Sequence, residues 1–173
     1  IFKKKLGYSP KLFSYPFGEY SSNLKKIITD LGFEYSFGQH SGVIDQTKKP
    51  LELPRFPINE KYGEIKRFKQ ILKTLPFPYK KIFPENRYLK VDENPPVVKI
   101  SFFKDLINIK NINCYSNEGN VWRKSDLKFI NNNEIVILLN DKFKSERGRI
   151  NCSLWHETGK WRWLGIQYVI AEY

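Results

Sequence analysis

Methionine, histidine and cysteine are scarce in this sequence of 173 residues, which has no Met, two His and two Cys. A catalytic zinc site needs three converging protein ligands, whereas His40 and His156 lie far apart in the sequence. We therefore expect both to be solvated side chains and this chain to hold no cofactor by itself. No apolar run approaches the roughly 20 residues of a membrane helix, and no signal-peptide pattern is present. We expect no membrane span, and the sequence favours no particular cellular location.

The lack of Met also bears on the first residue, which is Ile1. Because a primary translation product begins with Met, we expect a processed chain or a fragment. The composition, 40% hydrophobic and 16% aromatic, is sufficient for a packed core. The length suits one ordinary domain or two small ones.

Arginine is scarce as well, although the formal net charge is +12. Proteins that read bases and phosphates favour the fork geometry of Arg, whereas most cations here are Lys. We therefore favour a solvated basic surface over a nucleic-acid interface, and an acidic glycan or an anionic envelope surface would suit the same charge. The arginines are Arg55, Arg67, Arg87, Arg123, Arg147, Arg149 and Arg162.

The two cysteines, Cys114 and Cys152, both lie in the later part of the chain. One hypothesis is a disulfide between neighbouring strands, which a secreted or periplasmic protein would retain. The other is a pair of small, buried, apolar side chains. The sequence leaves both hypotheses open.

The segment 11–20, KLFSYPFGEY, predicts a short strand that ends in a tight turn. Pro16 ends the hydrogen-bond ladder of the strand, and Gly18 permits a positive φ in the turn. An amphipathic helix over 22–31 and a second strand over 33–37 follow. The three elements predict a βαβ unit with parallel strands, and loops at the carboxyl ends of such strands often form sites.

Prolines organise the middle of the chain. They make residues 51–58 extended, as an edge strand or a strand broken at a bulge. Helical spacing returns over 62–75. Residues 76–96 contain five prolines and no sustained period, so we expect a linker there and a domain boundary near Pro95.

Short alternating runs follow, separated by Asn, Gly and Ser, and they predict a small antiparallel β-sandwich over residues 97–173. The expected fold is therefore an α/β part, residues 1–94, followed by an all-β part. The predicted strands lie at 97–103, 109–115, 120–123, 135–139, 149–155 and 161–170.

Two stretches resemble a known family. The run KLFSYPFGEYSSNLKKIITDLGFEYSFGQHSGVID, followed by LPRFPINEKYG, resembles the second half of a polysaccharide deacetylase domain of the NodB type. The tail GRINCSLWHETGKWRWLGIQY resembles the β extension that accompanies this domain in one subgroup. The resemblance implies that residues 1–94 are the C-terminal part of a truncated (β/α) barrel.

The same resemblance implies the activity of the complete protein. It is a metal-dependent hydrolase that removes N-acetyl groups from a polysaccharide of the cell envelope or from an exopolysaccharide, and it uses a divalent metal such as zinc. The Asp-Asp and His-x-x-x-His motifs that supply the metal ligands and the base are missing from this chain. We therefore expect the isolated chain to be inactive.

The resemblance also implies roles for the turn after the first strand. The backbone N–H of Phe17 corresponds to the amide that stabilises the oxyanion, and an amide aimed at developing charge contributes about 3 kcal/mol. Tyr15, Pro16, Gly18 and Glu19 would shape the substrate groove. The alternative is a strand–helix turn without a catalytic role.

Many family members begin this motif with an Arg, which this sequence lacks there, and Arg55 is a candidate for the same support. An Arg among apolar neighbours either pairs with a carboxylate or faces solvent. Asn59 and Glu60 follow it. They either bond sugar hydroxyls or, for one of them, cap the next helix.

Tryptophans are concentrated near the end of the chain. Trp161 and Trp163 are two apart on one predicted strand, so they share a face, with Arg162 on the other. We favour a core position for this pair, because a small β domain needs large residues to fill it. An exposed pair would stack on sugar rings or unpaired bases. The alternative function is therefore a non-catalytic protein whose β domain binds a glycan or a nucleic acid.

Overall fold

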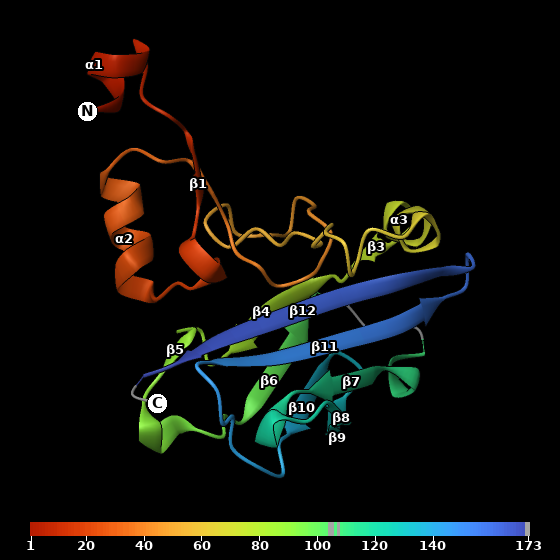
Figure 1. The fold of residues 1–173 in the computed structure, drawn as a ribbon. Helices are drawn as coiled ribbons and strands as arrows, with labels where there is room; N and C mark the ends of the chain where they lie inside the picture. Colours follow the sequence, from red (N-terminus) through yellow and green to blue (C-terminus); the bar gives the residue numbers. More distant parts are fainter. Residues whose placement is uncertain (104–105, 107, 172–173) are drawn as a thin grey trace.

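The computed structural model describes residues 1–103, 106 and 108–171, and this part of the chain is mostly β-strand with three α-helices (Figure 1). All three helices precede the long strands of the second half. The helices are α1 (Phe2–Leu6), α2 (Ser22–Asp30) and α3 (Ile65–Leu72).

The predicted βαβ unit is present. Strands β1 (Leu12–Ser14) and β2 (Tyr35–Phe37) pair in parallel, and α2 connects them. Ser21 caps this helix, because its Oγ accepts a hydrogen bond from the Leu24 N–H at 3.1 Å. The segment predicted to be extended adds a parallel bridge between Leu53 and Phe37. The described residues thus show three parallel segments, and they do not show a (β/α) barrel.

Two larger sheets contain the remaining strands. One has the order β3-β12-β11-β7-β8, with β5 also paired to β12, and the other has the order β4-β6-β10-β9. The strands of the first sheet are β3 (Leu75–Pro76), β5 (Tyr88–Leu89), β7 (Asn113–Ser116), β8 (Arg123–Lys124), β11 (Arg147–His156) and β12 (Lys160–Ile170). Those of the second are β4 (Tyr79–Phe83), β6 (Val98–Phe102), β9 (Asp126–Asn131) and β10 (Glu134–Leu138).

One hydrophobic core lies between these sheets. Ile100 and Ile137 of the four-stranded sheet and Ile150 and Ile166 of the six-stranded sheet belong to the same buried cluster. A second, small cluster under the βαβ unit contains Tyr15, Tyr20 and Ile28. The predicted change from an α/β part to a β-rich part is therefore confirmed.

Residues 76–96, predicted to be a linker, instead contribute strands to both large sheets. Phe77, Ile82 and Leu89 from this segment are buried in the common core. The prolines are compatible with this role, because they stand outside central strands or in two-residue strands. The β-rich part consequently begins at Leu75.

Most of the predicted strands of the second half are present, although residues 109–111 of the strand predicted at 109–115 form a 3₁₀ turn and β7 begins only at Asn113. Residues 118–120, which overlap the strand predicted at 120–123, form a short 3₁₀ turn. Of the predicted strand, only Arg123 lies in a strand, at the start of β8. Strand β9 was not predicted. Its side chains are mostly exposed, so the alternation that marks a half-buried strand is weak there.

Strand β12 uses both of its faces. Leu164, Ile166 and Tyr168 point into the core, as their alternation requires. The opposite face contacts the earlier half of the chain, since the Gly165 N–H donates to the Ser41 carbonyl at 2.6 Å and Trp163 packs edge-on against Phe56. This strand therefore joins the two halves of the molecule.

Cys114 and Cys152 lie directly opposite each other on β7 and β11 and form a disulfide. Of the two hypotheses for the cysteines, the structure supports the disulfide.

Replacing both cysteines with Ala should lower the free energy of unfolding by about 4 kcal/mol. The bond closes a loop with a sequence separation of 38, and opening that loop increases the entropy of the unfolded chain. Urea denaturation of the variant, and of the wild-type protein with and without a reductant, measures the effect. A midpoint insensitive to both changes would contradict it.

Gly165→Ala should destabilise the protein by about 2 kcal/mol, because a Cβ at this position would lie 2.5 Å from the Ser41 nitrogen and 2.6 Å from its oxygen. Gly159→Ala is the comparison, since a Cβ there meets no atom within 4 Å. It should cost about 1 kcal/mol through its positive φ alone. Equal losses in urea denaturation would show that the close backbone approach is not limiting.

Candidate functional site

The predicted turn follows β1 directly and forms the short 3₁₀ element η1 (Pro16–Gly18). Two consecutive residues have a left-handed backbone, with φ of 54° at Phe17 and 73° at Gly18. Gly18 is required here, because a Cβ would lie 2.4 Å from the Gln39 nitrogen. Phe17 adopts a conformation that is costly for a bulky residue, so its surroundings must stabilise it.

Gln167 of β12 supplies part of that stabilisation. Its Nε2 donates to the Phe17 carbonyl at 3.1 Å, and its Oε1 accepts from Arg149 Nε at 3.3 Å. Gln167 is only 3% exposed, so the amide group has little freedom to rotate. Among the described residues, the Phe17 N–H has no hydrogen-bond acceptor. The turn thus has an anchored carbonyl and a free amide.

Arg147 of β11 packs against the Phe17 ring, which nevertheless stays largely exposed. Its Cζ lies 4.8 Å from the centre of the Phe17 ring, and its Nε donates to Glu19 Oε1. The carboxylate of Glu19 is therefore engaged by an arginine. Alternation along β11 and β12 could have placed Arg147, Arg149 and Gln167 on one face, but it gives no information about the turn that packs there.

The other predicted residues of the turn divide into an inner and an outer set. Tyr15 and Gly18 are buried, and the Tyr15 hydroxyl donates to the Leu51 carbonyl at 3.1 Å. Pro16 and Phe17 are exposed. The two buried residues hold the turn in place, and the two exposed residues form its accessible surface.

Arg55 lies near the same strand end. Its NH1 donates to Ser14 Oγ at 2.9 Å, so it contacts the residue two before Pro16. Asn59 caps a local turn, because its Oδ1 accepts from the Tyr62 N–H at 3.0 Å. Glu60 is exposed. The structure therefore brings Arg55 to the predicted site, and it shows a capping contact for Asn59.

His40 is not solvated as predicted. Its ring lies 6.2 Å from the ring of Tyr20, and its Nδ1 is buried without a partner among the described residues. Burial, together with the nearby cation of Arg87, lowers the pKa of His40 from its ordinary 6.5 to about 4. The imidazole is therefore neutral near pH 7, and it packs beside Tyr20.

In the described part of the chain, no group of His, Cys, Asp and Glu side chains is arranged to hold a metal ion. Within the same residues, no helix has the length and apolar character needed to cross a bilayer. Neither the protein-family models nor the curated proteins include a match to this chain.

Lowering the pH from 6.5 to 4 should cost the protein about 3 kcal/mol of stability through His40. Its pKa is about 4 in the folded protein against an ordinary value of 6.5, so protonation favours the unfolded state. Unfolding free energies measured across this range should fall more steeply for the wild type than for His40→Gln. His156→Gln is the control and should keep the wild-type slope, and an identical slope for His40→Gln would contradict the assignment.

Proposed function

We propose that this chain forms one wall of the substrate groove of a NodB-type polysaccharide deacetylase, which removes N-acetyl groups from a cell-envelope glycan or an exopolysaccharide. The observation that carries the proposal is the free amide of Phe17 on an exposed turn whose carbonyl is anchored by Gln167. A glycan with N-acetylated sugars is the proposed substrate.

The chemistry assigned to this turn is electrostatic. Hydrolysis of an acetamide places negative charge on the carbonyl oxygen in the transition state, and a backbone N–H that is already oriented stabilises that charge. The left-handed backbone and the Gln167 contact fix the amide before the substrate arrives. The exposed Pro16 and the Phe17 ring are then available to contact the sugar next to the acetyl group.

The geometry of the first half supports the same family. Parallel segments in the order β1, β2 and Leu53, with α2 between the first two, are arranged like successive strands of an α/β barrel. Leu12 on β1 is 60% exposed and Tyr35 on β2 is 46% exposed. Further strands of a barrel would cover this apolar surface.

The divalent metal that the family uses is not assigned to any residue here. The described side chains provide no fitting set of ligands, so no step of this proposal runs through it. What this chain contributes is the oxyanion donor, the groove wall and, through Arg55, a cation beside Ser14.

The amide resonance of Phe17 tests the proposal directly. In an ¹⁵N NMR titration with triacetylchitotriose, the Phe17 amide should shift, whereas the same trimer without acetyl groups should leave it unchanged. In Gln167→Leu the shift should weaken, because the carbonyl is no longer anchored. Gln46→Leu, at an exposed position, is the matched control. An unmoved Phe17 amide, or equal shifts with both trimers, would contradict the role of the turn.

A further inference from the structure

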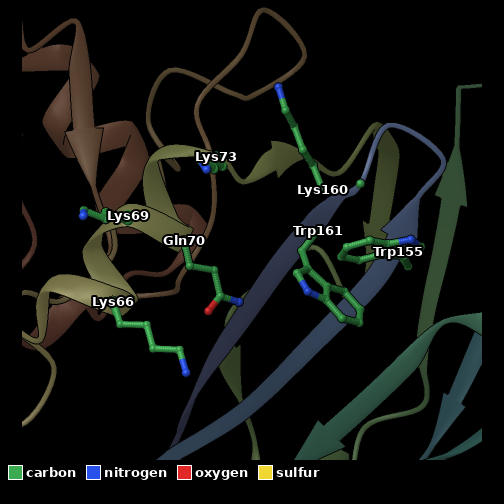
Figure 2. Close-up of a pocket in the computed structure, with 8 residues that line it drawn as sticks. Lys66, Lys69, Gln70, Lys73, Trp155, Lys160 and Trp161 are labelled. Carbon is green, nitrogen blue, oxygen red and sulfur yellow. The ribbon is translucent and has the colours of Figure 1, made fainter.

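A second surface lies between α3 and the hairpin of β11 and β12. It is a cleft of about 370 Å³, within the range typical of ligand sites. Figure 2 shows Gln70 of α3 pointing toward the hairpin, where Trp155 and Trp161 stand together. The lining residues are Lys66, Lys69, Gln70, Lys73, Trp155, Gly159, Lys160 and Trp161.

The charge of this cleft is positive. Lys66, Lys69 and Lys73 are three and four residues apart, so they follow one another along α3 and its C-terminal cap over roughly 10 Å, and Lys160 lines the cleft at the hairpin. In Figure 2, Lys66 extends toward the hairpin side, whereas the ends of Lys69 and Lys160 point away from the cleft. None of these four lysines forms an ion pair with a carboxylate of the described residues. Their charge is therefore available to an anionic ligand.

The aromatic part of the cleft is exposed. Trp155 and Trp161 are directly opposite on β11 and β12, with ring centres 4.9 Å apart in a T-shaped arrangement. Trp155 is 49% exposed, and neither ring belongs to the hydrophobic core. The predicted core position of Trp161 and Trp163 is therefore wrong, because their face of β12 contacts α3 and Phe56 instead.

We propose that this cleft binds a segment of an acidic polysaccharide. A pyranose ring stacks on the exposed face of Trp155, the carboxylates of the sugar meet the lysines of α3, and Gln70 hydrogen-bonds the hydroxyls. This inference does not depend on the function proposed for the Phe17 turn.

Two observations favour a glycan over single-stranded nucleic acid. All cations of the cleft are Lys, which binds as a point charge, whereas phosphate recognition commonly uses the Arg fork. The cleft also offers one aromatic pair, whereas single-strand binders use successive aromatic platforms along the chain.

Isothermal titration with oligogalacturonate, an acidic sugar polymer, tests the proposal. The wild type should bind it, added salt should weaken binding, and the uncharged methyl ester of the same oligomer should bind at least about tenfold more weakly. Trp155→Ala should weaken binding by about tenfold, the scale of a lost stacking contact. The double variant Lys66→Glu with Lys73→Glu should abolish it without changing the thermal midpoint.

Matched controls lie outside the cleft. Trp122, 51% exposed, is the control for Trp155, and Lys128 is an exposed control for the lysines. Trp122→Ala and Lys128→Glu should bind like the wild type. Tighter binding of an oligo-dT strand than of oligogalacturonate, equal affinity of wild type and Trp155→Ala, or no binding of either polymer would overturn the proposal. None of these measurements involves the Phe17 amide, so the two proposals succeed or fail separately.

Discussion

The arrangement of the two halves depends on one buried cation, the guanidinium of Arg87. This residue is 6% exposed, its NH1 donates to the Pro84 carbonyl, and its Cζ lies 5.4 Å from the ring centre of Tyr168 on β12. Tyr20, from the other half, approaches the same guanidinium, and burial raises the pKa of this tyrosine. A buried charge is costly unless its partners stay in place, so each partner restrains the others. The contacts of Arg87 with Tyr168 and Tyr20, which we call the junction, are thereby held in one geometry.

That constraint explains how an exposed turn can have a fixed conformation. Phe17 has an unfavourable backbone, and Gln167, which anchors its carbonyl, lies on β12 next to Tyr168. Because Tyr168 is held by the junction, the opposite face of the strand is held as well. The unfavourable backbone of Phe17 is then stabilised by the packing around Tyr168, which does not itself belong to the turn. Such strained backbone, stabilised by its surroundings, is common at binding and catalytic sites. The Gly165 contact with Ser41 adds a second attachment on the same strand.

Periodicity in the sequence predicted the elements better than it predicted their neighbours. The βαβ unit and the long strands follow from alternation and helical spacing, and Gly18 followed from the need for a positive φ. Residues 76–96 were misread, because prolines suggest a linker when no partner strand is known, yet β4 pairs with β6. Alternation correctly placed Trp161 and Trp163 on one face of β12, but the other face, with Leu164 and Ile166, lines the core. It could not predict that Phe56 packs against Trp163 on the tryptophan face, since that contact joins distant parts of the chain.

Arginine and lysine side chains have different roles in this structure. Arg147, Arg149 and Arg162 contact Glu19, Gln167 and the Pro76 carbonyl, so their forks are occupied by partners within the chain. A planar group with fixed donors suits such defined contacts, whereas a flexible lysine keeps its charge in solvent. These arginines are therefore engaged within the chain, and lysines provide most of the net charge of +12. A surface with this composition attracts anions over a distance but selects poorly among them. The proposed selectivity for a glycan would then come from the more rigid groups within the basic surface, the aromatic pair of the cleft and the Phe17 turn.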